Sequence, residues 1–470
     1  MLKKILGYSM GTWLGAIVAF IALPVATYFY SKEELGKINY YFSIINIALS
    51  IILLGLDQAY IRYFFEYSDE NKRSIFTFNI IFTICFTVLL SLVSCLFDYA
   101  LSEIIIGEDI LYFEIIISLH VIALTIVRYF QLLYRFNGMV FYFTIVSVLN
   151  TILFKVVYLG GIFISTGAKD AVLFSSIASL VISVILIVFN KKCFGSILNI
   201  KKDILREEFI YAIPVLPTIL VAVLNNYLPV FFLKECVSYS EVALYSIAIT
   251  IGSIITLVHN GLNTYFEPFV FKNYHTDVSE IRKINILIVD IIIFLSFSLV
   301  LVQEIVLKIY NKTYSSASTI VPFLIYAALF YGISDFISIG IKIEKKMTYN
   351  IFIYLVGFIS NFILCYLLVP SYGLIGTAIA VLLSSMCLNS VRMYIGNKFF
   401  NIMTFESRYF VIFCLAVSIC VCNILIYNSL VKYMLLFLIW SISAYYLHIP
   451  SYTSIILKKI GGVKNCKKSC

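Results

Sequence analysis

The chain has 470 residues, of which 62% are hydrophobic and 13% are charged, and its formal net charge is +9. A soluble protein carries about 25% charged residues, so this chain has too few charges to cover a water-soluble core. The sequence therefore excludes a soluble enzyme and predicts a polytopic membrane protein, whose positive charge marks topology and lipid contact rather than nucleic-acid binding.

Fourteen apolar runs are long enough to cross the hydrocarbon layer, which takes about 20 helical residues. They lie at residues 8–30, 38–61, 75–97, 112–134, 141–165, 171–189, 209–232, 242–266, 284–303, 319–341, 350–369, 372–396, 409–427 and 431–449. The first resembles a signal peptide, but it ends in Tyr28-Phe29-Tyr30 without a small-residue cleavage site, which indicates a first span. The connecting loops are short, so we expect no soluble domain.

The basic residues predict the orientation of these spans. If the N-terminus is cytoplasmic, 26 of the 34 Lys and Arg lie on the cytoplasmic side and seven on the outer side. This asymmetry follows the positive-inside rule only if the number of spans is even and both termini are cytoplasmic. The segment 98–111 carries four acidic residues and no basic one, as expected of an outer loop.

Three short matches indicate an internal repeat. Leu23-Pro24-Val25 recurs as Leu228-Pro229-Val230 at an offset of 205, and Gly55-Leu56-Asp57 recurs as Gly261-Leu262-Asn263 at 206. A weaker match pairs Asn190-Lys191 with Asn397-Lys398 at 207. The offset spans six helices, an even number, so both copies would have the same orientation in the membrane.

The predicted fold class is an all-α polytopic membrane protein with about fourteen transmembrane helices, arranged as two parallel six-helix repeats plus two C-terminal helices. The expected divisions are residues 1–206, residues 207–400, and residues 401–470 with a basic tail. Two bundles of this kind can rock against each other and give alternating access. The prolines of spans 1 and 7 could act as hinges, or they could be ordinary features of membrane helices.

Several stretches resemble the polysaccharide transporter family, the Wzx-type flippases of the multidrug/oligosaccharidyl-lipid/polysaccharide superfamily. They are GLDQAYIRYF (55–64), YAIPVLPTILVAVLNNYLPVFFL (211–233), ALYSIAITIG (243–252), NTYFEPFVF (263–271) and YGLIGTAIAVLLSS (372–385). The resemblance covers nearly the whole chain. Span 1 lacks the Arg residues of the relative that flips the peptidoglycan precursor, which argues against that substrate.

The resemblance implies a flippase in the bacterial cytoplasmic (inner) membrane. It would move undecaprenyl-diphosphate-linked oligosaccharide units to the outer leaflet for O-antigen or capsule synthesis, through a cationic cavity and with H⁺ or Na⁺ as the coupling ion. The implied partners are membrane lipids, a polysaccharide polymerase and a chain-length regulator. We expect no cofactor and no metal site, because the eleven Cys show no ligand spacing and no phosphate-binding loop occurs.

Charged groups within spans cost at least about 2.5–3.5 kcal/mol at the bilayer centre, so they are candidates for function. Lys155 lies among apolar residues and is predicted to contact phosphate or to pair with an intramembrane acid. Arg128 could contact entering diphosphate or could follow the positive-inside rule. Asn225 and Asn226 could bind sugar hydroxyls or could support a helix interrupted by prolines.

The candidates for gating or ion coupling are mostly acidic. Arg62 and Glu66 are four residues apart and could pair at an inner gate, while Asp57 should face elsewhere, towards the other lobe. Asp290 and Asp335 are the candidates for proton or sodium coupling, although each lies near a charged span end. His120 and His259 are interpreted as hydrogen-bonding packing residues.

Two other functions stay open. A drug/cation antiporter of the same superfamily would need acidic residues buried in its spans, of which this chain has few. A polytopic membrane enzyme of polysaccharide assembly is also possible, but no long outer loop and no catalytic constellation occurs in the sequence. We therefore expect a transporter rather than an enzyme.

Overall fold

The computed structural model describes residues 2–94, 100–107, 113–197, 200–344, 346, 348–402, 407–425 and 429–447. These segments form α-helices and short 3₁₀ helices, and none of them contains a strand. The predicted all-α fold is therefore confirmed.

The helices have the following bounds in chain order: α1 (Leu2–Phe29), α2 (Lys32–Ile52), α3 (Leu56–Tyr63), α4 (Asp69–Ser94), α5 (Ala100–Ile106), α6 (Phe113–Phe136), α7 (Val140–Lys155), η2 (Val157–Phe163), α8 (Ala168–Phe189), η3 (Lys191–Cys193), α9 (Lys202–Cys236), α10 (Tyr239–Asn273), α11 (Val278–Leu307), η5 (Lys312–Thr319), α12 (Val321–Ile337), α13 (Ile339–Ile343), α14 (Tyr349–Phe399), α15 (Ser407–Leu425) and α16 (Ser429–Tyr446).

Each of the fourteen apolar runs falls mainly on helix in its described residues. Within those residues, eight helices are long and apolar enough to cross a bilayer, and ten if each of two bent pairs counts as one span. Shorter apolar helices add Leu14–Phe29, Val411–Leu425 and Val431–Tyr446. The 51-residue α14 covers the two predicted runs 350–369 and 372–396. Near the start of the second run, the backbone at Gly373 is not helical (φ 52°). The chain is thus a multi-pass membrane protein.

Contacts divide the chain into two compact units. Unit 1 contains residues 1–250, 309–316 and 350–388, and unit 2 contains residues 251–308, 317–349 and 389–470. The helices α10 and α14 each contribute to both units. This division reflects contacts, whereas the division at residues 206 and 400 rests on sequence repetition and stays a prediction.

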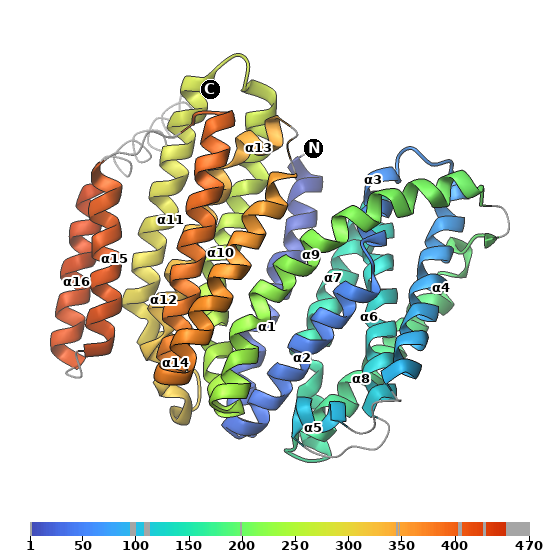
Figure 1. Ribbon diagram of the computed structural model, residues 1–470, viewed down its shortest axis with the longest axis horizontal. Helices are drawn as coiled ribbons and strands as arrows, with labels where there is room; N and C mark the ends of the chain where they lie inside the picture. Colours follow the sequence, from blue (N-terminus) through green and yellow to red (C-terminus); the bar gives the residue numbers. More distant parts are fainter. Residues whose placement is uncertain are drawn as a thin grey trace, which may run out of the picture. The chain divides into compact units, whose positions relative to one another are not determined.

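Within unit 1, α6 forms the centre of the bundle. It packs against α4, α7 and α8, and α1 lies along α7. The helices α4, α6 and α8 lie side by side (Figure 1). The helices α2 and α3 both contact α9, so the polar segment that begins at Leu56 is held against the start of α9.

The predicted span 38–61 is not one continuous helix. The helix α2 ends at Ile52 and α3 begins at Leu56, and between them Leu54 and Gly55 have positive φ values of 49° and 76°. A Cβ atom on Gly55 would lie 2.7 Å from the carbonyl oxygen of Ala212 in α9. The expectation of an unbroken span is wrong because Gly55 adopts a left-handed conformation and allows α9 to approach closely.

The variant Gly55→Ala is expected to lower the thermal midpoint more than Gly138→Ala does. Both glycines have left-handed φ values, 76° and 73°, so both variants carry a conformational cost of about 1–2 kcal/mol. Only Gly55 has backbone within clashing distance, whereas nothing lies within 4 Å of a Cβ on Gly138. Thermal unfolding of the detergent-purified variants measures the difference, and equal midpoints would contradict the close approach of Ala212.

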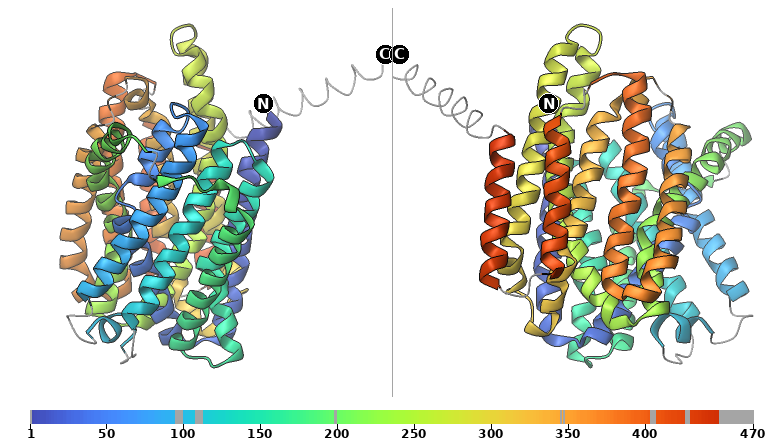
Figure 2. Two further views of the ribbon diagram at one scale, coloured as in Figure 1. Left: turned by 90° about the vertical axis from the view of Figure 1, so that its right-hand side faces the viewer. Right: turned by 60° about the vertical axis from the view of Figure 1, so that its left-hand side comes forward.

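Within unit 2, the two C-terminal helices are anchored on α11. The helices α15 and α16 lie side by side, and α16 packs on α11 (Figures 1 and 2). Glu304 of α11 forms an ion pair with Lys432 (2.8 Å) and accepts a hydrogen bond from the hydroxyl of Tyr433 (2.5 Å). A charged link of this kind fixes α16 against α11 at one level along the helix axis.

Candidate functional site

Asp57 and Arg128 form an ion pair within unit 1. Asp57 lies in the first turn of α3 and is 4% exposed, and its Oδ2 accepts hydrogen bonds from Arg128 Nη2 at 3.0 Å and Gln58 Nε2 at 2.9 Å. Arg128 reaches it from α6 and keeps about a third of its side chain exposed (33%). We call Asp57, Gln58 and Arg128 the first cluster. Asp57 thus pairs with a residue of the predicted N-terminal lobe, and the expectation that it also faces the other lobe stays a prediction.

Arg62 and Glu66 pair with each other, as their spacing predicts. The Arg62 guanidinium donates to the Glu66 carboxylate, and both side chains are exposed. An exposed pair of this kind contributes little to stability, typically less than about 1 kcal/mol. Because the pair is weak, breaking it costs little free energy, as the opening of a gate would require.

Asp335 is the centre of a denser charge cluster in unit 2. Its carboxylate lies on α12, is 7% exposed, and contacts His259 Nε2 at 3.1 Å and Asn263 Nδ2 at 3.2 Å, both on α10. The guanidinium of Arg392, on α14, donates to its other oxygen. We call His259, Asn263, Asp335 and Arg392 the second cluster. Three helices of unit 2 thus converge on one carboxylate.

The two clusters occupy matching positions of the repeat. Asp57 corresponds to Asn263 at an offset of 206, and Arg128 corresponds to Asp335 at an offset of 207. Arg128 donates a hydrogen bond to Asp57, and Asn263 donates one to Asp335. The aromatic neighbours correspond as well: the Tyr60 and Tyr129 ring centroids are 6.4 Å apart, and those of Phe266 and Phe336 are 5.2 Å apart. Both copies of the predicted repeat therefore have a polar contact at corresponding sequence positions. The acid is at the earlier position in the first copy (Asp57) and at the later position in the second copy (Asp335).

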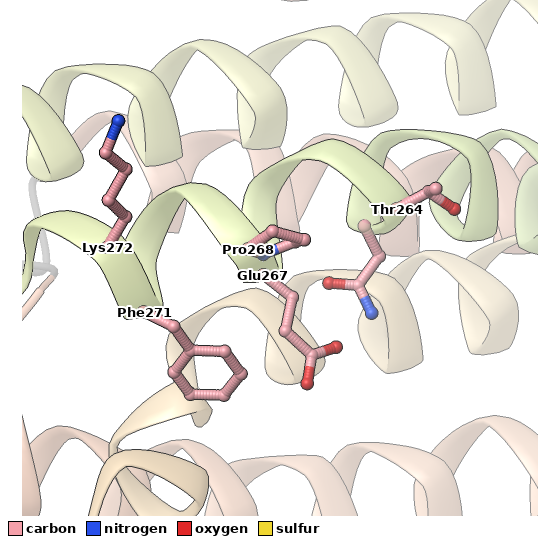
Figure 3. Close-up of a pocket in the computed structure, with 6 residues that line it drawn as sticks. Thr264, Glu267, Pro268, Phe271 and Lys272 are labelled. Carbon is pink, nitrogen blue, oxygen red and sulfur yellow. The ribbon is translucent and has the colours of Figure 1, made fainter. Parts of the chain in front are cut away.

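An open pocket lies along α10 and shares Asn263 with the second cluster. It has a volume of about 610 Å³ and is lined by Asn263, Thr264, Glu267, Pro268, Phe271 and Lys272. Glu267 and Phe271 project to the same side of the helix, whereas Lys272 points away (Figure 3). Glu267 also pairs with Lys342 of α13 at 3.3 Å. The segment that begins at Gly261 and matches the motif at Gly55 thus has charged and aromatic side chains in the pocket wall.

Lys155 is the last residue of α7, where the bent pair α7–η2 turns by 50°. Its side chain is exposed, and no acidic group of the described chain lies within ion-pair distance of it. The prediction that it pairs with an intramembrane acid is therefore wrong within the described residues.

Asn225 lies one turn before Pro229 in α9, which runs as one helix from Lys202 to Cys236 although it contains three prolines. Pro229 has no N–H to bond the Asn225 carbonyl four residues earlier, and Asn361 Nδ2 donates to that carbonyl oxygen and to Asn225 Oδ1, each at 3.0 Å. The structural alternative for Asn225 is thus the one observed. Asn226 is exposed.

Asp290 lies on α11 in unit 2, fully buried, and accepts a hydrogen bond from the Tyr409 hydroxyl of α15 at 3.3 Å. Among the predicted residues, the structure therefore brings together Asp57 with Arg128 and Arg62 with Glu66. Asp290 and Asp335 belong to separate contacts, and Lys155 and Asn226 stand apart from both clusters.

Sequence reasoning missed several members of the second cluster. From the sequence, His259 is interpreted as a packing residue, Asn263 appears only as part of a motif match, and Arg392 is not among the candidates. The repeat offset holds the signal that finds them, because applying 206–207 to the Asp57–Arg128 pair gives Asn263 and Asp335. No offset finds Arg392, which only the packing of α14 places beside Asp335.

In the described residues, no group of three or more His, Cys, Asp or Glu is arranged to hold a metal ion. Both clusters instead combine single carboxylates with Arg, Asn, Gln or His. The charges of each cluster are few and closely balanced, an arrangement whose chemistry suits protons, monovalent cations or anionic ligands.

Residues 1–274 match the family described as polysaccharide biosynthesis protein, which is more than half of the chain. The chain belongs to this family. The resemblance inferred from its motifs is thereby confirmed, and the first cluster, α9 and the Asn263 segment of this family member all lie within the matched residues. A search of curated proteins found no match.

Solved structures with similar folds support the architecture. The lipid II flippase MurJ in an inward closed conformation aligns over 96% of this chain and 99% of that protein, with a TM-score of 0.72 and 15% identity. The MATE multidrug transporter DinF-BH aligns over 85% of this chain and 95% of that protein, with a TM-score of 0.52 and 15% identity. At this identity the likeness shows the fold of the family member and nothing more specific.

Proposed function

We propose that the protein flips undecaprenyl-diphosphate-linked oligosaccharide units from the cytoplasmic to the outer leaflet of the bacterial inner membrane. The observation that carries this proposal is the family match, which ties a multi-pass membrane fold to polysaccharide synthesis. The products would serve O-antigen or capsule assembly, together with a polymerase and a chain-length regulator. Both termini would be cytoplasmic, as the basic residues indicate.

The substrate chemistry assigns roles to the predicted residues. A diphosphate needs cationic groups, which Lys155, Arg128 and Arg62 would supply, and a glycan needs hydroxyl-binding groups. Asn226 is exposed and would contact sugar, whereas the carbonyl and side-chain oxygens of Asn225 are engaged by Asn361. Lys155 is the strongest of these candidates, because it has no acidic partner in the described chain.

Gating and ion coupling would use the acidic residues. Asp57 and Glu66 hold Arg128 and Arg62 in the state described here, and release of either pair would expose a cation to the diphosphate. Asp335 and Asp290 would take up H⁺ or Na⁺ and thereby reset alternating access. No phosphate-binding loop for ATP occurs in the sequence, so an ion gradient would be the energy source.

The test is an assay of the leaflet that holds the lipid-linked repeat unit, using radiolabelled sugar and cells lacking the gene. We expect the unit to accumulate in the cytoplasmic leaflet and to return to the outer leaflet when the gene is restored. Normal outward appearance without the protein would end the flippase proposal. Loss of resistance to cationic drugs with unchanged glycolipid transport would indicate the drug/cation antiporter instead.

The variant Lys155→Ala is expected to reduce outward transport at least about tenfold at equal protein level, since an uncompensated cation near a diphosphate contributes about 1.5–3 kcal/mol of charged hydrogen bonding. Lys192→Ala, which removes an exposed lysine from η3, is the matched control and should leave transport unchanged. Equal export by both variants would remove Lys155 from the substrate path.

A further inference from the structure

Glu208 is a buried acid outside both clusters. It lies in the second turn of α9 with 0% of its surface exposed, and no basic side chain forms an ion pair with it in the part of the chain that the structure describes. A buried carboxylate without a basic partner is energetically costly, so it takes up a proton or a cation.

Polar side chains surround this carboxylate without satisfying it. The Tyr67 hydroxyl, from the segment after α3, donates to Glu208 Oε1 at 3.4 Å. The Asn79 amide of α4 lies within hydrogen-bonding reach of the carboxylate, whereas Glu208 Oε2 has no well-formed hydrogen bond in the described residues. Burial, followed by the Glu208 and Glu207 carboxylates, raises the pKa of the Tyr67 hydroxyl, which therefore remains a donor.

Two more buried hydroxyls belong to the helices around the start of α9. Tyr60 of α3, which packs on α9 and α6, and Tyr129 of α6 are 0% exposed, and their ring centroids are 6.4 Å apart. Their two hydroxyls and Glu208 Oε2 are buried polar atoms without a hydrogen-bond partner in the described residues. Buried polar groups in native proteins are almost always satisfied, so such a gathering indicates an occupant.

We propose that Glu208, Asn79, Tyr60 and Tyr129, the Glu208 site, bind a monovalent cation, either Na⁺ or a hydrated proton. One carboxylate balances one positive charge, and its oxygen neighbours are the ligands that hard cations prefer. The neighbouring Asp57–Arg128 pair is neutral as a whole and does not compensate Glu208. A divalent ion would lack ligands, since the described residues hold no group of three acidic, His or Cys side chains.

A cation at this site would restrain the movement of α3. The statement that this cation is the coupling ion rests on the proposed function. The helix α9 carries Glu208 and packs on α3, which carries Asp57 and Arg62. A cation held between α9, α3, α4 and α6 would tie these helices together, and its release would free α3 to move. Asp290 and Asp335 would then not be the only acids involved in coupling.

The experiment measures the thermal midpoint of the full chain, purified in detergent without glycolipid, in choline, K⁺ and Na⁺ salts at constant ionic strength and over a range of pH. The variants are Glu208→Gln and the milder Tyr67→Phe, and Glu207→Gln is the control because Glu207 is the exposed neighbour on the same helix. A cation that binds only the native state raises the midpoint, here by about 5 °C at a concentration far above its dissociation constant.

For a Na⁺ site, we expect Na⁺ to raise the midpoint of the wild type and of Glu207→Gln, and Glu208→Gln to abolish the response. Tyr67→Phe should raise the Na⁺ concentration needed about tenfold. For a proton site, Na⁺ has no effect, and the wild type loses stability relative to Glu208→Gln as the pH rises, because the buried carboxyl must then ionise. Identical responses of wild type and Glu208→Gln to both Na⁺ and pH would overturn the proposal.

The experiment distinguishes failure of the cation-site proposal from failure of the flippase proposal. The midpoints are measured without substrate, so ion binding would persist if the leaflet assay excluded glycolipid transport. Conversely, a protein that transports glycolipid but shows no response dependent on Glu208 would keep the proposed function and lose this site.

Discussion

Replacing Asp335 by Asn is expected to abolish transport and to destabilise the protein by about 3 kcal/mol. The substitution leaves Arg392, whose side chain is 11% exposed, without its carboxylate, and removing one member of a buried pair costs about 3–5 kcal/mol. The lower end is expected because His259 and Asn263 remain as polar neighbours. Thermal unfolding and the leaflet assay, both at matched protein level, measure the two effects.

The double variant Asp335→Asn with Arg392→Gln separates stability from coupling. Removing both charges takes away the guanidinium that has lost its carboxylate, so the midpoint should recover most of the loss while transport stays absent. Recovery of transport together with stability would show that Asp335 is structural only, and it would leave Asp290 and Glu208 as the remaining acids for coupling.

Breaking the first cluster is expected to have the second-largest effect. Arg128→Gln leaves Asp57 with Gln58 alone and should cost about 2 kcal/mol, less than in unit 2 because Arg128 is about a third exposed (33%). Transport should fall at least about tenfold if Arg128 also meets the diphosphate. The measurements are the thermal midpoint and the rate of appearance of the labelled unit in the outer leaflet.

The exchange variant Asp57→Arg with Arg128→Asp distinguishes pairing from position. It keeps one positive and one negative group in contact, so stability should return towards that of the wild type, but it moves the cation from α6 to α3. If transport returns as well, the pair acts only as a link between α3 and α6. If transport stays low while stability returns, the cation is needed on α6, as the substrate role of Arg128 requires.

The sequence predicted the helices well because membrane-spanning segments obey a strong local rule. A run of about 20 apolar residues satisfies its backbone hydrogen bonds within one helix, and the described residues of each of the fourteen runs are mainly helical. Its errors lie at Gly55 and Lys155, where a span is interrupted, because a left-handed glycine and a bend between helices leave hydropathy unchanged.

The candidate site was predicted in part, and the limit is physical. The four-residue spacing predicted the Arg62–Glu66 pair, which forms although Glu66 lies in the turn that follows α3. Contacts between helices, such as Asp57 with Arg128 and Asp335 with Arg392, depend on rotation and depth in the bundle, which composition does not encode. Glu208 was missed for the same reason: its position at the polar start of α9 suggests exposure, whereas it is fully buried and accepts a hydrogen bond from Tyr67.

The sequence by itself thus determined the membrane class, the apolar runs and the family, and it predicted the repeat, because each of these follows from local composition or from motifs read in order. Only the tertiary structure decided which charges are paired and which are left alone. Lys155 without an acid, Glu208 without a base and Asp335 among three partners are consequences of helix packing, which joins residues far apart in the chain and fixes the local electrostatics on which function depends.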